Sequence, residues 1–188
     1  MIVTVAELQT FGNVDDTLEV DNTLLVICLN AANDACEKYC GIKFTAATAV
    51  TEYQDAVELN REIYLGYKNV STLTTLKYDS ASDFGDDTVV SSDAYHLDTA
   101  EGKIVLDGSY SPGPRRWQAV YNGGWTNLTA PSSLRWAVLG MASVLWEKAK
   151  DGGLGLKSDR VGDAQISFDT MIPDDVKAIL KLHKRYIL

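Results

Sequence analysis

Four stretches of the chain space their hydrophobic residues at intervals of three and four, which is the repeat of an amphipathic helix. The first, Val5–Phe11, begins after Thr4, and Glu7 stands at capping-box spacing from that threonine. The other three expected helices cover residues 21–40, 131–150 and 173–186. The two ends of the chain are therefore predicted to form a helical bundle.

Between residues 44 and 120 the pattern changes to short runs of β-branched and aromatic residues that are separated by turn residues. Strands are expected at 51–53, 62–65, 71–78, 94–97, 103–106 and 117–121. Residues 98–102 join two of these runs as a hairpin loop, and Pro112 and Pro114 are expected to interrupt the sheet before Arg115. The predicted fold class is α+β, a helical bundle with an inserted small antiparallel β-sheet.

The length of 188 residues favours a single domain with a substantial core. We expect one domain over 1–188, with a helical core from 1–43 and 131–188 and a β insertion over 44–130. Within the core, residues 151–169 are rich in glycine and have no hydrophobic period. This stretch is therefore expected to be a mobile arm.

The net charge of −9 is spread unevenly. Residues 131–188 hold 7 acids and 9 bases, and only in this part of the chain do bases outnumber acids. An acidic body repels phosphate, which argues against a groove that grips nucleic acid. No apolar run reaches the roughly 20 residues of a membrane helix, and the N-terminus does not have the pattern of a secretory signal. The protein is therefore expected to stay in the cytoplasm of the cell that makes it, without a membrane partner.

Side chains that carry chemistry are sparse. Cys28, Cys36 and Cys40 fall in one predicted helix, and the two histidines, His96 and His183, are far from them in sequence. A zinc site usually needs four ligands, so the cysteines are interpreted as small buried thiols. No metal, cofactor or catalytic residue is expected, and the protein is predicted not to be an enzyme. A small hydrolase with two carboxylates stays an alternative, because none of the 26 acids can be singled out.

Four tryptophans lie within thirty residues of one another: Trp117, Trp125, Trp136 and Trp146. Such residues serve either a core or an interface. The core is the preferred place for Trp136 or Trp146. The helix over 131–150 is apolar almost all round, so it must be covered on several sides, by its own domain or by a neighbouring subunit.

Several short motifs together resemble the phage head–tail connector (adaptor) family. They are the opening residues 2–8, the end of the second helix at Tyr39-Cys40-Gly41, residues 120–125 with Asn122-Gly123-Gly124-Trp125, residues 130–134 and residues 172–176. The motifs occur in the family's order and touch both ends of the chain. They are caps, turns and strand ends, and the chain departs from shorter relatives in its longer middle, 53–111.

The resemblance implies a structural adaptor in the neck of a tailed phage, made in the host cytoplasm and assembled into the virion. Such an adaptor forms a homo-oligomeric ring of about twelve copies beneath the portal. It extends the DNA channel, lets DNA pass without sequence-specific binding, and meets a downstream neck or tail protein. A tail-completion or stopper protein of the same neck is the nearest alternative.

The C-terminal arm and helix are predicted to contact the portal or a second copy, because they combine glycines, an apolar stripe and the only cluster of bases. The expected contact residues are Leu154, Leu156, Val176, Lys177, Ile179, Leu180, Lys181, Lys184, Arg185 and Tyr186.

Overall fold

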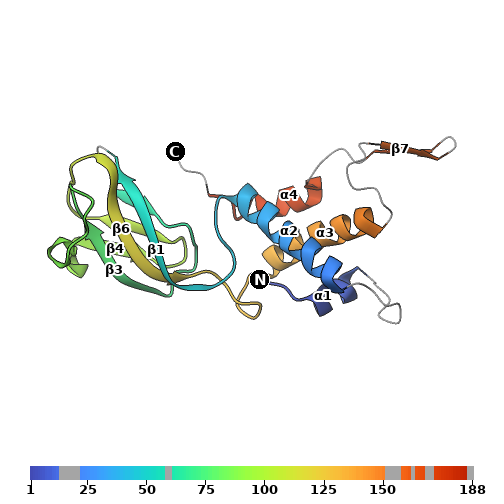
Figure 1. Cartoon of the computed structure of the whole chain (residues 1–188), viewed down its shortest axis with the longest axis horizontal. Helices are drawn as coiled ribbons and strands as arrows, with labels where there is room; N and C mark the ends of the chain where they lie inside the picture. The colour runs from blue at the N-terminus through green and yellow to red at the C-terminus, as the bar shows by residue number, and fades with distance from the viewer. Residues whose placement is uncertain (13–21, 58–60, 151–157, 162–163, 168–171, 186–188) are drawn as a thin grey trace. The chain divides into compact units, whose positions relative to one another are not determined.

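The computed structural model describes residues 1–12, 22–57, 61–150, 158–161, 164–167 and 172–185. The chain divides into two compact units, a helical unit of residues 1–41 with 127–188 and a β unit of residues 42–126 (Figure 1). Both helices and antiparallel strands are present, so the predicted α+β class is confirmed. The grouping of the whole chain as one adaptor domain stays a prediction.

The helical unit contains α1 (Val5–Phe11), α2 (Asn22–Cys40), α3 (Ser132–Lys150) and α4 (Asp174–Leu180). In Figure 1, α2 and α3 run in opposite directions across each other, and α1 contacts both of them. The core between the helices is made by their buried aliphatic and cysteine side chains: Leu8, Leu25, Cys28, Leu29, Ala32, Cys36, Cys40, Leu134, Ala137, Val138, Met141, Ala142, Val176 and Leu180. The three cysteines are buried, as predicted.

The ends of α1 and α2 follow local sequence rules. The Thr4 hydroxyl accepts the Glu7 N–H at 3.3 Å, and the Glu7 carboxylate accepts the Thr4 N–H at 2.8 Å, which completes the predicted capping box. Gly41 has a φ of +69°, the left-handed conformation expected for a residue that ends a helix. Asp21, where this second helix was predicted to begin, lies outside the described residues.

α4 ends earlier than predicted, at Leu180 rather than residue 186. The Leu182 and His183 N–H groups donate to carbonyls three residues back, on Ile179 and Leu180, both at 3.0 Å. These shorter bonds form tight turns instead of another α-helical turn. The amphipathic spacing of the sequence continues past Leu180, but the backbone helix does not.

The β unit holds two three-stranded antiparallel sheets instead of the single sheet that was predicted. In the first, β6 (Gly113–Gly123) lies between β1 (Ala47–Ala56) and β3 (Thr72–Tyr78). In the second, β5 (Lys103–Leu106) lies between β2 (Glu62–Tyr64) and β4 (Tyr95–Asp98). The loop predicted at 98–102 joins β4 to β5, where Asp98 pairs with Lys103. Short 3₁₀ turns at Asp86–Thr88 and Ser92–Ala94 precede β4.

Pro114 does not interrupt the sheet before Arg115, as the sequence suggested, because β6 begins at Gly113. Its pairing with β3 ends at Trp117, and its pairing with β1 shifts register between Gln54 and Ala56. A proline that cannot donate a hydrogen bond is tolerated at such an irregular strand start. Arg115 has a φ of +49° at this irregularity.

Part of the stretch expected to be an arm forms secondary structure. Strands β7 (Ser158–Val161) and β8 (Ala164–Ser167) pair in antiparallel register. The remaining residues of 151–169 lie outside the described part of the chain. The predicted mobility of this arm stays a prediction.

The tryptophans are placed differently from the prediction. Trp117 and Trp125, in the β unit, are buried, whereas Trp136 is 40% exposed and Trp146 is half-buried. Trp117 packs against Tyr78 and Tyr110 at ring-centroid distances of 4.9 and 4.6 Å. The preference for Trp136 as a core residue was wrong, because α3 turns its buried stripe away from that side chain.

Candidate interaction surface

The apolar stripe of the last helix is used inside the helical unit. Val176 and Leu180 are 1% and 0% exposed. α4 packs over Gly140 of α3, where an added Cβ would lie 3.4 Å from Val176 Cγ2. These two side chains therefore hold the C-terminal segment on its own bundle and are covered in this structure.

Residues 183–185, which follow α4, also contact the helical unit. The Arg185 N–H donates to the Cys40 carbonyl at 2.9 Å, and His183 Nε2 lies 2.8 Å from the Ser133 hydroxyl. The Lys184 ammonium lies 4.9 Å from the centre of the Tyr39 ring. Residues 183–185 thus contact the last turn of α2 and the first turn of α3.

Only part of the predicted contact set remains at the surface. Lys181 is exposed, Ile179 is half-buried, and Lys177 pairs with Asp174 at 3.1 Å. Leu154, Leu156 and Tyr186 lie outside the described residues. The neighbouring Leu182, which was not in the predicted set, is 78% exposed.

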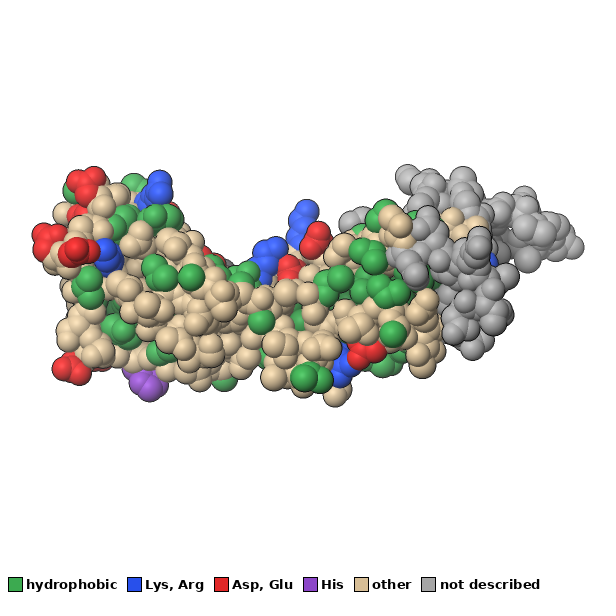
Figure 2. Space-filling model, turned by 60° about the horizontal axis from the view of Figure 1, so that its bottom comes forward, with side chains coloured by type: hydrophobic (Ala, Val, Ile, Leu, Met, Phe, Trp, Pro, Cys, Tyr) green, Lys and Arg blue, Asp and Glu red, His purple; other side chains and the backbone are tan. Residues whose placement is uncertain are grey.

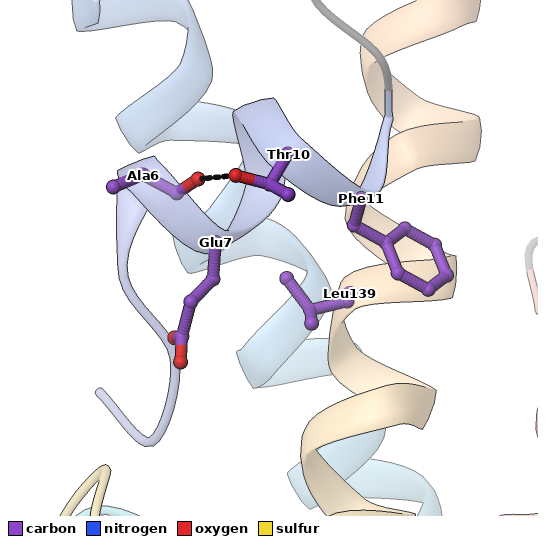
Figure 3. Close-up of a pocket in the computed structure, with 5 residues that line it drawn as sticks. All are labelled: Ala6, Glu7, Thr10, Phe11 and Leu139. Carbon is purple, nitrogen blue, oxygen red and sulfur yellow. Dashed lines mark hydrogen bonds between the residues drawn. The ribbon is translucent and has the colours of Figure 1, made fainter.

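A second surface, which the sequence did not single out, lies between α1 and α3. Ala6, Glu7, Thr10 and Phe11 of α1 and Leu139 of α3 line an open depression of about 410 Å³ (Figure 3). The Thr10 hydroxyl donates to the Ala6 carbonyl at 2.9 Å, so its polar group is already satisfied. The depression therefore offers mainly hydrocarbon to a ligand or partner.

Two aromatic side chains extend this surface. Phe11 and Trp136 meet edge to face with ring centroids 6.1 Å apart, and each is 40% exposed. Trp136 is exposed because Leu134, Ala137, Val138 and Met141 occupy the buried side of α3, and a helix of 3.6 residues per turn places residue 136 opposite them. We call Phe11, Trp136, Leu139 and the depression the α1–α3 surface. Figure 2 shows hydrophobic side chains gathered on the outside of the helical unit.

One ion pair borders the α1–α3 surface. Arg135 on α3 donates to the Glu7 carboxylate on α1, and both side chains are about one-third exposed. Burial alone would raise the pKa of Glu7, but hydrogen bonds from Thr4 and the charge and hydrogen bond of Arg135 bring that pKa below its usual value of 4.5. Glu7 is therefore charged at neutral pH, where it both caps α1 and ties α1 to α3.

The described residues include a buried cysteine whose thiolate is suppressed. Burial, together with the charges of Cys40 and Glu37, raises the pKa of Cys36 to about 12, which suppresses its thiolate. Among the described residues there is no group of three or more His, Cys, Asp or Glu side chains that could hold a metal ion. None of the described helices is long and apolar enough to span a membrane.

The signal for the α1–α3 surface was present in the sequence. The almost uniform apolarity of residues 131–150 indicated that several sides of this helix need covering, by its own domain or by a neighbouring subunit. The pattern could not show that α1 would leave Trp136 and Phe11 partly open, because that depends on where α1 packs.

Solved structures with a similar fold come from gene transfer agent particles. The chain aligns over its full length with 91% of a chain in "Neck of empty GTA particle computed with C6 symmetry", with a TM-score of 0.65 and 21% identity. It aligns equally fully with 91% of a chain in "Virion of native gene transfer agent (GTA) particle", with a TM-score of 0.59 and 20% identity. A chain in "Neck of native GTA particle computed with C12 symmetry" aligns with a TM-score of 0.59 and 20% identity, and the alignment covers 98% of this chain and 89% of that chain.

A comparison with curated proteins finds no match. The family model described as head completion protein matches residues 1–186, which is almost the whole chain. The protein therefore belongs to the head completion protein family.

Proposed function

We propose that this protein is a structural component of a virion neck, where it joins the head to the tail. The observation that carries this function is the match of the head completion protein family over residues 1–186. The fold agrees with it, since the similar solved structures are from necks and a virion of gene transfer agent particles. The hydrolase considered as an alternative is not favoured by either comparison.

The protein acts as a ring of identical copies. Two of the similar structures are necks computed with C6 and C12 symmetry, which supports a closed cyclic assembly. In this proposal the ring lies beneath the portal, extends the DNA channel and meets a downstream neck or tail protein. DNA passes through it without sequence-specific contacts, in keeping with the net charge of −9 and with the acidic side chains that gather on the β unit in Figure 2.

The described carboxylates support a structural role, because several of them hold the backbone in place. The Asp79 carboxylate accepts the N–H groups of Ala81, Asp83 and Phe84 at 2.7 to 2.9 Å. The Glu52 carboxylate accepts the Gly66 N–H at 2.9 Å through one of its oxygens. Carboxylates that accept backbone hydrogen bonds in this way stabilise a scaffold.

The exposed part of the C-terminal segment is proposed to face the portal. Val176 and Leu180 anchor this segment within the unit, and Lys181, with the adjoining Leu182, is open to a partner. An exposed ion pair is worth about 0–1 kcal/mol, so Lys181 steers the approach more than it holds the complex.

The test of this function is co-sedimentation of the purified protein with the portal of the same particle. The wild-type protein is expected to sediment with the portal, and Lys181→Glu is expected to weaken this binding several-fold at low salt. Lys38→Glu, a charge reversal at an exposed site on α2, is the matched control and should bind as the wild type does. If the wild-type protein does not sediment with the portal, a place directly beneath the portal is refuted. Equal weakening by both substitutions would refute the role of Lys181.

A further inference from the structure

The helical unit exposes apolar side chains on two opposite sides of the α2–α3 pair. On α2, Leu25, Leu29, Ala32 and Cys36 are buried, and Ile27, about half a turn away from them, is 56% exposed. On α3, Trp136 lies opposite the buried stripe. Since the buried sides of the two helices face each other, Ile27 and the α1–α3 surface point away from each other.

A head-to-tail contact between identical copies needs two different surfaces of this kind, one on each side of the subunit. We propose that Ile27 of one copy inserts into the α1–α3 surface of the next copy, against Phe11, Trp136 and Leu139. This inference rests on the proposed ring, and it names the helices through which neighbouring copies touch.

The lining of the depression suits the aliphatic side chain of Ile27. The depression is lined by Ala6, Phe11, Leu139 and the hydrocarbon of Thr10, whose hydroxyl already bonds within α1. A branched aliphatic side chain can therefore enter without stranding a polar group. Glu7, the charged residue in the lining, is engaged by Thr4 and Arg135.

The charges around the two sides also match. Neighbouring copies in a ring of many subunits differ by a small rotation, so α2 of one copy and α3 of the next run in opposite directions and cross obliquely, as they do within one copy (Figure 1). Asp34 lies about two turns after Ile27 on the same exposed side of α2. Because the two helices run in opposite directions, docking carries Asp34 toward the N-terminal half of α3, where Arg135 and the helix dipole are positive.

An ion pair between Asp34 of one copy and Arg135 of the next would fix the register of the contact more than it would add to its affinity. Asp34 takes part in no ion pair with another described residue, whereas Arg135 already binds Glu7. The guanidinium has five N–H donors and can serve a second carboxylate. Part of its charge is nevertheless neutralised by Glu7, so the apolar contact dominates.

The size of the surfaces favours a ring contact over a stable pair. Each side comprises a few side chains, whereas a stable two-protein interface buries roughly 800 Å² on each partner. Pairing the α1–α3 surface with itself would also leave Ile27 exposed on both copies. A head-to-tail arrangement covers both sides of every copy, and each copy makes the contact twice.

Crosslinking of the full-length protein tests this contact. A variant with Ile27→Cys and Leu139→Cys is treated in concentrated solution with a short bismaleimide and separated on a denaturing gel. We expect a ladder of oligomers from the double variant, and at most dimers from an equal mixture of the two single variants. Wild type is the control, since its three cysteines are buried.

Adding Trp136→Ala to the double variant should reduce the ladder about tenfold, because the Trp136 ring forms one wall of the proposed contact. Adding Val89→Ala, at an exposed hydrophobic position of the β unit, should leave the ladder unchanged. The proposal is overturned by the absence of a ladder, by dimers from either single variant alone, or by a ladder that Trp136→Ala does not weaken. If the ladder fails while the protein still sediments with the portal, only this contact is wrong and the neck function stands.

Discussion

Substitutions of Leu180 and Leu182, near the C-terminus, are expected to have very different effects on stability. Leu180 is 0% exposed and Leu182 is 78% exposed, although the two stand two residues apart. Leu180→Ala removes three buried carbons, worth about 2.4 kcal/mol at ~0.8 kcal/mol each. The cavity left behind raises the expected loss to about 3–5 kcal/mol. Leu182→Ala should cost about 0.5 kcal/mol, because most of its side chain already contacts water.

Urea unfolding followed by helical circular dichroism measures both substitutions, because the long helices belong to the helical unit. The Leu180→Ala midpoint should fall far below the wild-type midpoint, and the Leu182→Ala midpoint should stay close to it, with similar slopes. A shift below about 0.5 kcal/mol for Leu180→Ala, or equal shifts for the two variants, would show that α4 is not part of the core. Removal of residues 171–188 is for the same reason expected to destabilise the helical unit.

Four further predictions concern single positions. Glu7→Gln should cost about 1 kcal/mol near neutral pH. Because the folded-state pKa of Glu7 is lowered, this difference is present above pH 4.5 and disappears as the pH falls, which urea midpoints across the acid range will check. Gly124→Ala should destabilise the β unit by more than about 2 kcal/mol, since φ is +91° and a Cβ would lie 2.8–2.9 Å from backbone atoms of Phe44, Thr45 and Ala46. Gly41→Ala, with a φ of +69° and open space around its Cβ, should cost only about 1 kcal/mol. Urea unfolding measures both glycine substitutions. Cys36 should react with a thiol reagent only after unfolding, and rapid labelling of the native protein would contradict its burial.

Local rules predicted the helix ends well. The Thr4–Glu7 spacing and the position of Gly41 each depend on residues within one turn, and the structure has the capping box and the left-handed glycine that these residues imply. The end of α4 was missed, because amphipathic spacing does not show where hydrogen bonds switch from four residues back to three.

Long-range pairing explains what the sequence missed in the β unit. β1 begins at Ala47, well before the predicted Thr51, because Ala47 pairs with Gly123 across the sheet. No local pattern marks residues 47–50 as a strand, and Ala49 even adopts a positive φ there. The division into two sheets likewise depends on which strand finds which partner.

The predicted contact residues show a similar limit. An apolar stripe must be covered, but its spacing does not tell whether its own unit or another chain covers it. Val176 and Leu180 are covered by the helical unit, whereas Phe11 and Trp136 are left partly open. Nothing in the one-dimensional pattern separates these two outcomes, because both depend on the packing of short helices against α3.

Electron cryomicroscopy of particles that carry this protein tests its proposed place as a ring in the neck. We expect a closed ring of density between head and tail into which the helical unit and the β unit each fit, with every copy contacting two neighbours. Particles that lack the protein should accumulate as heads without tails. Tailed particles of normal appearance in its absence, or density for the protein at a site other than the neck, would contradict the proposed neck function.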